Sequence, residues 1–414
     1  MILLAHPTGN ENVRAVLAAL DQADLLAKFV TALGWSNASW LVDRLPANLH
    51  SQLARRGYDL PHSKIRVFPL RETIRLLAQR MQQRWLIKHE RGWASIDRVW
   101  RETDRFAADA LQKTYQEQKI NSVYGYEDCA ERLFETAAEM GVHRIYDLPI
   151  AYWERARRLL QEEAERYPEW ESTLSGILDS DEKCARKTRE LNLAELVVCP
   201  SNFVLDSLPE RVRSSKRCVA VPFGSPLLSE AEPLEQKPVD RPLRLLFAGA
   251  LTQRKGLGDL LTAMKLVSSR EIELVLMGSL LRPLAWYRQQ FAGFIYAPPR
   301  PHRDVLRLMR SCDVLVLPSI VEGRALVQQE AMICGLPLIV TRNAGGEDLI
   351  EEGETGFLVP IRSPEAIAEK IAWFATNRAR IPSMAVAARK RASQFTWHGY
   401  GENVIAAIKS LIGE

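Results

Sequence analysis

Short apolar runs alternate with stretches of helical length along most of this chain. Before residue 228 they lie at Ile2–Ala5, Trp40–Val42, Ile65–Phe68, Ser122–Tyr124, Arg144–Tyr146, Leu196–Cys199 and Val219–Val221. After residue 242 they lie at Leu243–Phe247, Ile272–Met277, Val314–Leu317 and Leu338–Val340. Short buried strands that alternate with helices form parallel βαβ units. The sequence therefore predicts an α/β architecture built on parallel sheets.

A polar, proline-bearing stretch at 228–242 (LSEAEPLEQKPVDRP) interrupts this alternation. Stretches of this composition are typical of interdomain linkers, and 414 residues suit two domains of ordinary size. We therefore expect an N-terminal domain over 1–227 and a second domain over 243–396. The amphipathic tail at 397–414 is expected to form a closing helix.

The composition excludes several classes of protein. The chain has 47% hydrophobic and 26% charged residues, typical of a globular protein, and its net charge of +4 gives no argument for a nucleic-acid partner. No apolar run reaches the roughly 18 residues of a spanning helix, and Met1–Ala5 is interpreted as a strand rather than a secretion signal. The six cysteines lack metal-ligand spacing and are expected to be free thiols. His143 and His302 are interpreted as structural, because no cluster of histidines and carboxylates indicates a metal.

Two glutamates mark the part of the second domain most suited to bind a ligand. Glu322 follows a buried strand, and Glu330 lies in the next helix, about two turns further on. Both carboxylates can therefore face the crevice at the carboxyl ends of parallel strands, where open α/β sheets bind ligands. The spacing alone has little weight in a chain with 51 acidic residues. Its context is more specific, because Gly345 and Gly346 open a second turn of the same kind.

The stretch from Cys312 to Pro360 resembles the donor-binding domain of glycosyltransferase family 4 (glycosyl transferases group 1), whose fold is GT-B. The shared residues are Glu322, Gly323, Glu330, Ala331, Gly345, Gly346 and Gly356 to Val359. Arg324 and Ala325 stand where the family usually has Phe and Gly. The resemblance covers about residues 194–414 and implies two doubly wound, Rossmann-like domains that face each other across a cleft. It also implies that the closing helix crosses back to the N-terminal domain, instead of packing on its own domain.

The resemblance implies a nucleoside-diphosphate sugar as the donor, bound without a metal or another cofactor. Its diphosphate needs fixed positive charge and oriented amides, because the leaving group gains negative charge as the sugar–oxygen bond breaks. In the loop after Leu243–Phe247, Gly249 ends the strand, and Arg254 and Lys255 project from the turn. We expect Lys255 to contact the diphosphate. Arg254 would replace the arginine that many relatives have where this chain has Ala250.

The residues before and inside the helix of Glu330 complete the predicted donor site. Gly323, Arg324 and Ala325 precede that helix, whose positive dipole end would face the phosphates or the sugar. The resemblance assigns the ribose hydroxyls to Glu330, because a carboxylate offers two acceptors. It assigns the sugar ring, or the positive charge that develops near C1, to the catalytic Glu322. Arg324 either lies beside the phosphates or pairs with Glu322.

The N-terminal domain is expected to supply the acceptor side. Gly9 and Asn10 lie in the turn after the first strand, which corresponds to the family's glycine-rich loop. An ordinary strand-to-helix turn capped by Asn10 gives the same pattern. Asp147 stands where many relatives have a histidine. It either polarises an acceptor hydroxyl as a catalytic group or caps the helix after Pro149.

The segment 71–101 is strongly basic. It has eight Lys or Arg residues and three acids, an excess of five that exceeds the net charge of the whole chain. Ile74, Leu77, Met81 and Trp85 recur in it at helical spacing. This combination is typical of a helix that lies on an anionic membrane surface. The alternative is that the apolar stripe packs on the domain core and that the basic residues are solvated.

The resemblance implies a retaining glycosyltransferase in the synthesis of a glycan, polysaccharide or glycolipid. Its acceptor would be the hydroxyl of a carbohydrate or of a lipid-linked sugar. Two alternatives stay open, a sugar-nucleotide epimerase of the same fold and a non-catalytic scaffold that binds a glycan or a nucleotide. We expect the protein in the cytoplasm, either free or peripheral on the inner face of the membrane.

Overall fold

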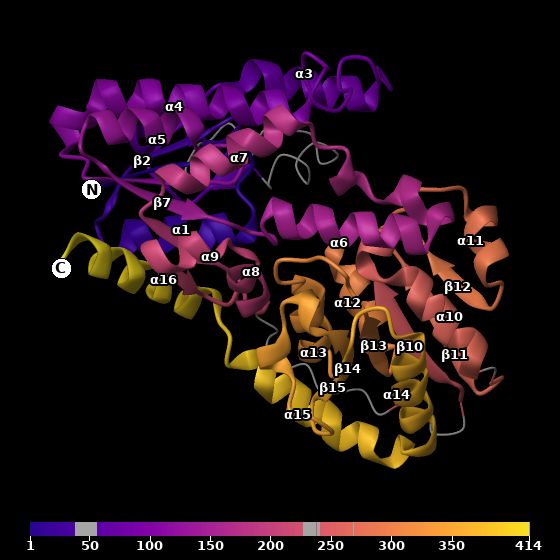
Figure 1. Cartoon of the computed structure of the whole chain (residues 1–414). Coiled ribbons are helices and arrows are strands. Elements are labelled where there is room, and N and C mark those ends of the chain that lie inside the picture. Colours follow the sequence, from indigo (N-terminus) through magenta and orange to yellow (C-terminus); the bar gives the residue numbers. More distant parts are fainter. Residues whose placement is uncertain (38–55, 227–236, 238–240, 268, 414) are drawn as a thin grey trace.

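The computed structural model describes residues 1–37, 56–226, 237, 241–267 and 269–413, which form two α/β domains (Figure 1). Each domain is built around its own parallel sheet. The predicted architecture of two doubly wound, Rossmann-like domains is therefore confirmed. The strand expected at Trp40–Val42 and most of the linker expected at 228–242 lie outside the described residues.

The N-terminal sheet has seven parallel strands in the order β5-β2-β1-β6-β7-β8-β9. Their bounds are β1 Ile2–Ala5, β2 Leu26–Thr31, β5 Ile65–Val67, β6 Ser122–Tyr126, β7 His143–Asp147, β8 Leu196–Cys199 and β9 Arg217–Ala220. The short strands β3 (Trp35–Ser36) and β4 (Gly57–Tyr58) pair separately. The helices of this part are α1 Glu11–Gln22, α3 Pro69–Arg80, α4 Ile96–Gln118, α5 Glu131–Glu139, α6 Trp153–Arg166, α7 Asp181–Leu193, α8 Asn202–Ser207 and α9 Glu210–Ser215.

The C-terminal sheet has six parallel strands in the order β12-β11-β10-β13-β14-β15. Their bounds are β10 Leu243–Ala248, β11 Ile272–Met277, β12 Phe294–Ala297, β13 Val314–Leu317, β14 Leu338–Thr341 and β15 Gly356–Val359. The helices that follow the chain are α10 Leu257–Val267, α11 Leu284–Gln290, α12 His302–Arg310, α13 Leu326–Ile333, α14 Pro364–Thr376, α15 Ile381–Ser393 and α16 Trp397–Ile412.

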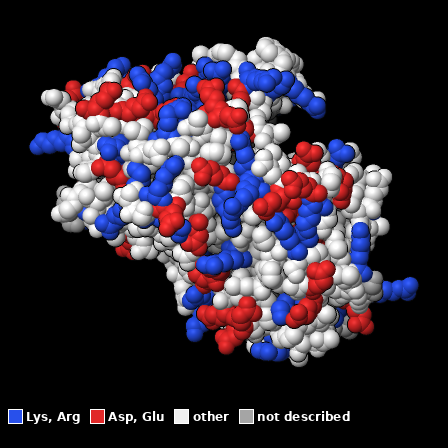
Figure 2. Space-filling model, viewed as in Figure 1, with Lys and Arg blue, Asp and Glu red and all other residues white. Residues whose placement is uncertain are grey.

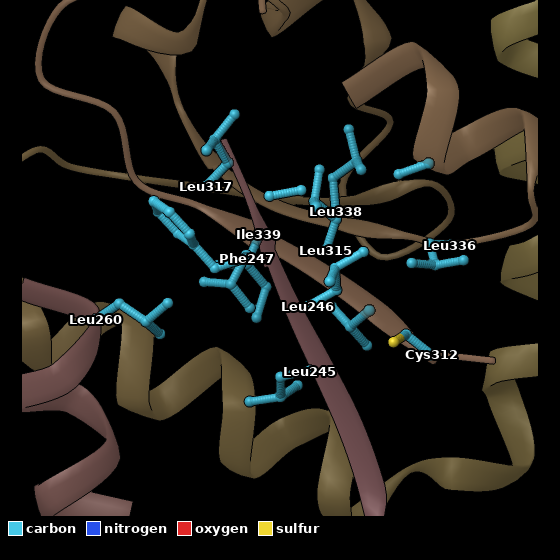
Figure 3. Packing of buried hydrophobic residues seen from close by; sticks show 14 of the residues in the cluster. Leu245, Leu246, Phe247, Leu260, Cys312, Leu315, Leu317, Leu336, Leu338 and Ile339 are labelled. Atoms are coloured by element: carbon cyan, nitrogen blue, oxygen red, sulfur yellow. The ribbon is translucent and has the colours of Figure 1, made fainter. Parts of the chain in front are cut away.

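Helices cover both faces of the C-terminal sheet, and this explains why its strands are mostly apolar. All four residues of β13 and of β14 are buried. Figure 3 shows Leu245, Leu246 and Phe247 of β10 in one cluster with Leu315 and Leu338 of the neighbouring strands. This rigid sheet fixes the loops at its carboxyl edge, where the predicted donor residues lie.

Helix α16 packs against α1 in the N-terminal domain, although it follows the C-terminal domain in sequence (Figure 1). Tyr400, Val404 and Ile408 are buried in a cluster with residues of β1, α1 and β8. A Cβ at Gly401 would lie 2.7 Å from the Cβ of Ala19, so the two helices are in close contact. The end of the chain thus ties the two domains together.

A second tie comes from α6 and the 3-10 segment that follows it at Pro168–Thr173. Trp170 is buried in the core cluster of the C-terminal sheet. Arg166 of α6 pairs with Asp259 of α10 at 2.7 Å. Part of the chain before residue 227 therefore packs on the C-terminal domain.

In the part of the chain that the structure describes, no helix is both long enough and apolar enough to cross a bilayer.

Candidate active site

Glu322 lies between two cations at the carboxyl edge of the C-terminal sheet. Lys255 donates a hydrogen bond to Glu322 Oε1, and Arg254 Nη1 lies 3.0 Å from Glu322 Oε2. Burial acts to raise the pKa of Glu322, but the charges of Lys255 and Arg254 outweigh it and hold that pKa below its ordinary value. Two cations and one carboxylate leave a net positive charge in a nearly buried cluster.

Two glycines shape the loop that carries these cations. Gly249 has a φ of +139°, and a Cβ there would lie 2.8 Å from Cε of Lys255. Gly256 has a φ of +70°, and a Cβ there would lie 2.0 Å from the carbonyl oxygen of Pro318. Side chains at either position would therefore push the loop away from β13 or displace Lys255. The predicted role of Gly249 as the end of the strand fits this geometry.

Gly323 lies where the C-terminal domain meets the N-terminal domain. A Cβ at Gly323 would approach the carbonyl oxygen of Pro149 to 1.7 Å, and Ser201 Oγ donates to the Gly323 carbonyl at 2.7 Å. The loop after Glu322 is therefore fixed by two segments of the other domain. Ala325 is the N-cap residue of α13, so the amides of its first turn begin directly beside this loop.

Glu330 is half-buried on α13 and faces residues of both domains. His302 Nδ1, at the start of α12, lies 3.8 Å from Glu330 Oε1. Burial raises the pKa of Glu330, the charge of His302 acts to lower it, and the charge of Glu11 acts to raise it further. Glu11 is the first residue of α1, so a charge of the N-terminal domain acts on Glu330.

Arg324 does not pair with Glu322, so this part of the sequence interpretation was wrong. Its guanidinium pairs with Asp348 at 2.6 Å and donates to the Gly345 carbonyl at 3.1 Å. It also lies over the ring of Phe395, at 4.9 Å from the ring centre. Arg324 is buried and holds the turn of Gly345 in place, and its assignment as a donor ligand stays a prediction.

Asp147 requires a second correction. It is 1% exposed, and the hydroxyls of Tyr124 and Tyr400 donate to its Oδ2 at 2.7 and 3.4 Å. Burial raises its pKa to about 7, although both hydrogen bonds act to lower it. The helix after Pro149 has Tyr152 as its N-cap and no side-chain cap. Asp147 is therefore neither a helix cap nor a carboxylate open to an acceptor, but a buried contact between β7 and α16.

The loop after β1 is shaped by a contact between Gly9 and Tyr58. A Cβ at Gly9 would lie 2.2 Å from the Tyr58 hydroxyl oxygen, so no other residue fits without a shift. Arg14 donates to the Gly9 carbonyl at 3.0 Å and lies over the Tyr58 ring. Asn10 is exposed at the N-cap of α1, but its side chain makes no cap hydrogen bond. The glycine is thus needed for close packing, and Asn10 is open to solvent.

Two features of this region were not predicted from the sequence. His302 was interpreted as structural, and its position 3.8 Å from Glu330 was not predicted. Arg14 and Tyr58 line a hollow of about 470 Å³ beside Gly9, together with Glu11, Leu60 and Trp397. The alternation of apolar and polar residues in α1 gives no signal for this hollow, because Tyr58 and Trp397 come from distant parts of the chain.

One group of side chains in the described part of the chain has the spacing to bind a metal ion, and it lies outside the predicted donor site. It consists of His89, Glu90 and Asp179. Lys183 and Lys187 also pair with Asp179, at 2.9 and 3.3 Å. These ammonium groups already neutralise the carboxylate, so its electrostatic attraction for a metal ion is weak.

Comparison with known families identifies the C-terminal domain. Residues 230–394 match the family model described as "Glycosyl transferases group 1". Over 127 residues the chain is 31% identical to D-inositol 3-phosphate glycosyltransferase of Mycobacterium bovis, which covers 30% of this chain and 26% of that protein. The enzyme of the same name from Corynebacterium urealyticum is 28% identical over 116 residues, 28% of this chain and 27% of its own length. The matches thus span about a quarter of these relatives.

Solved structures resemble the whole chain. Sucrose-phosphate synthase from Thermosynechococcus elongatus superposes with a TM-score of 0.65 and 17% identity over 100% of this chain and 99% of that one. HepE of Anabaena in complex with UDP superposes with a TM-score of 0.61 and 15% identity over 99% of both chains. At these identities the likeness concerns the fold. The GT-B fold expected from the sequence is therefore confirmed.

Proposed function

Because residues 230–394 match the family model of the glycosyl transferases group 1, we propose that this chain is a retaining glycosyltransferase. It would move a sugar from a nucleoside-diphosphate sugar to a hydroxyl acceptor, as a member of family 4. The observation that carries the proposal is the cluster of Lys255, Arg254 and Glu322 beside the first turn of α13. This cluster offers positive charge and helix amides in one place, as a leaving diphosphate requires.

The cluster supports a specific order of events at the donor. In the ligand-free protein, Glu322 neutralises part of the charge of Lys255 and Arg254. A bound diphosphate would draw both cations toward its oxygens, and their attraction would increase as negative charge develops on the leaving group. The freed Glu322 carboxylate would then face the sugar. In front-face transfer, the leaving phosphate oxygen takes the proton of the acceptor hydroxyl, and the acceptor oxygen forms the new bond to C1.

Glu330 is the proposed ligand of the ribose hydroxyls. Its half-buried carboxylate lies on the fifth residue of α13, just over one turn from the start of that helix, and the charge of Glu11 in the N-terminal domain acts on its pKa. HepE of Anabaena, which shares the fold, binds UDP, and this supports a nucleoside diphosphate as the ligand class. A carboxylate that is only half-buried can bind two hydroxyls without a large change in the protein.

The acceptor is proposed to bind on the N-terminal side of the cleft. A hollow beside the Gly9 loop is lined by Glu11, Arg14, Tyr58, Asp59 and Trp397 together with several apolar side chains. Its charged groups and its two aromatic rings suit a carbohydrate, either free or linked to a lipid. The six cysteines are all free, which supports a reducing compartment such as the cytoplasm.

A thermal-shift screen of the full chain against UDP, GDP, ADP and CMP tests the donor class. One nucleoside diphosphate should raise the melting temperature, since a ligand that binds the native state adds stability with the logarithm of its concentration. The shift should be lost in Glu330→Ala. If none of the four stabilises the chain, the proposed donor site is wrong. A separate incubation with the matching sugar nucleotide distinguishes a transferase, which slowly releases the diphosphate, from an epimerase, which returns an altered donor.

A further inference from the structure

Helix α3 and the turn that follows it expose an unusual number of large apolar side chains. Among the described residues, thirteen large hydrophobic side chains are exposed, and eight of them lie between residues 67 and 96. These eight are Val67, Leu70, Leu76, Leu77, Met81, Trp85, Trp93 and Ile96. Leu70, Leu77 and Met81 share one stripe of α3, and Trp85 is 69% exposed beyond its end. Of the predicted stripe of Ile74, Leu77, Met81 and Trp85, the last three are exposed and Ile74 is half-buried, so the alternative in which the whole stripe packs on the core is wrong.

The polar side of α3 faces the domain. Glu72 is fully buried and pairs with Arg56 and Arg75, each at 2.6 Å. Arg71 lies over the ring of Trp93 at 4.4 Å, which holds the turn against the helix. These ion pairs hold the buried side of α3 against the domain. The apolar side of the helix therefore faces outward. The exposed stripe is therefore a stable feature of this surface.

The charges around this surface are almost all positive. The acids Glu72 and Asp97 are buried, and Asp97 is neutralised by Arg186 at 2.5 Å. The exposed charged side chains of the segment include Arg80, Arg84, Lys88, Arg91, Arg98 and Arg101. Along α4 lies a hollow of about 320 Å³ with an excess of positive charge, because six arginines line it beside the three acids Glu102, Asp104 and Glu131. Figure 2 shows the region over α3 as uncharged atoms crossed by a band of Lys and Arg.

We propose that α3 and the turn at residues 81–95 form a docking surface for an anionic phospholipid membrane. The apolar stripe and the two tryptophans would enter the boundary between headgroups and acyl chains, where amphipathic aromatic rings are favoured. The surrounding arginines and lysine would contact the phosphate headgroups. The chain would lie on the membrane without crossing it.

The arrangement fits a lipid surface better than a protein partner. Basic side chains flank an apolar stripe that is extended by two exposed tryptophans, the combination found in helices that lie on anionic membranes. A planar anionic surface can satisfy all of these cations at once. If the proposed function is also correct, the surface would bring a lipid-linked acceptor close to the cleft, because α3 begins just after the carboxyl end of β5. That extension rests on the proposed function, whereas membrane binding itself does not.

Co-sedimentation of the full chain with vesicles tests the docking surface without any assay of activity. One set of vesicles holds phosphatidylcholine alone, and the other holds phosphatidylcholine with phosphatidylglycerol. The chain should sediment with the anionic set at low salt and much less with the neutral set, and added salt should weaken the binding. A variant with Arg80→Gln, Arg84→Gln and Lys88→Gln should bind the anionic vesicles about 100-fold more weakly, since each basic residue near the surface contributes about fivefold.

A second variant, with Leu77→Gln, Met81→Gln and Trp85→Gln, should lose the part of the binding that resists salt. Matched controls change exposed residues elsewhere in the chain, namely Arg270, Arg307 and Lys390 for charge and Leu266, Leu281 and Val386 for apolar contact. Both controls should bind like the unchanged chain. Failure of the unchanged chain to sediment with anionic vesicles at low salt overturns the proposal and leaves a protein partner as the occupant to seek. Equal loss in the controls and the α3 variants also overturns it.

Discussion

Lys255 supplies charge that the proposed reaction needs most in its transition state. Lys255→Ala should lower kcat by about 100-fold to 1,000-fold, the usual range for one group that stabilises developing charge. KM should change much less, because the attraction grows as the diphosphate leaves. Steady-state kinetics with the preferred donor check this, with Lys390→Ala as an exposed control. An unchanged kcat with a raised KM would make Lys255 an anchor of the ground state instead.

Glu330 should matter for nucleotide binding and little for folding. Glu330→Ala should weaken the binding of the nucleoside diphosphate by about 1.5–3 kcal/mol, the range for hydrogen bonds to a charged group. Its burial raises its pKa, so the carboxylate is not a source of native stability and its removal should leave the melting temperature unchanged or slightly higher. Isothermal titration measures the affinity, and Glu365→Ala is the exposed control. Equal affinity of the folded variant and the unchanged chain would remove Glu330 from the site.

Asp147 should make the protein less stable as the pH rises. Its pKa in the folded chain is about 7, against an ordinary value of 3.8, so folding favours the protonated form. This contribution to stability is complete below pH 3.8 and is lost as the pH rises through 7. Between pH 5 and 7, the free energy of unfolding should fall by about 2 kcal/mol more in the unchanged chain than in Asp147→Asn.

Urea denaturation at the two pH values measures this difference, and Asp24→Asn, at an exposed acid, should leave the pH dependence unaltered. A variant of Asp147 with the same pH dependence as the unchanged chain would show that the carboxylate is ionised in the folded state.

The sequence predicted the surroundings of some site residues better than those of others. Lys255 and Glu322 were predicted in one site, because each follows a strand of the same parallel sheet, and the structure brings them into contact. Asp147 was misread because its partner Tyr400 lies 253 residues away. Arg324 was misread for the same reason, since Asp348 comes from a later turn. Sequence spacing gives the edge of the sheet, but it does not give the partner of a side chain.

Among the elements, α16 offers the clearest test of packing, because one of its side chains is fully buried against the N-terminal core. Ile408 is fully buried between α16 and that core. Ile408→Ala should lower the free energy of unfolding by about 2–5 kcal/mol, the range for loss of a buried aliphatic side chain. Lys409→Ala, one residue further on and exposed, should have little effect. Similar stabilities of the two variants in urea denaturation would mean that α16 is not packed on α1.

The strands of the first domain's sheet were predicted more completely, with β2 missed out of seven, than those of the second, where β12 and β15 were missed out of six. The apolar runs of β13 and β14 are continuous and buried, whereas β10 and β11 each hold one charged residue, Arg244 and Glu273. β2 was missed because Lys28 interrupts its apolar run. β12 was missed because this strand has only four residues and is partly exposed. The orientation of α3 was left open, since a helical stripe alone does not tell which side meets the core. The buried pairs of Glu72 decide it.

At the scale of the whole molecule, the two domains are held in one arrangement by ties far from the cleft. Trp170 enters the C-terminal core from the N-terminal half, and α16 returns in the opposite direction. Gly323 and Pro149 meet between these ties. The predicted donor residues and the Gly9 loop thus lie on two domains that these ties hold together.

Release of nucleoside diphosphate from a panel of sugar nucleotides tests the central claim most directly. The full chain and Lys255→Ala are each incubated with UDP-, GDP- and ADP-linked sugars without acceptor, and the free diphosphate is measured over time. The unchanged chain should slowly hydrolyse one donor, and the folded variant should be slower on that donor by about 100-fold or more. No release from any donor, or equal release by both proteins, would contradict a glycosyltransferase site at Lys255.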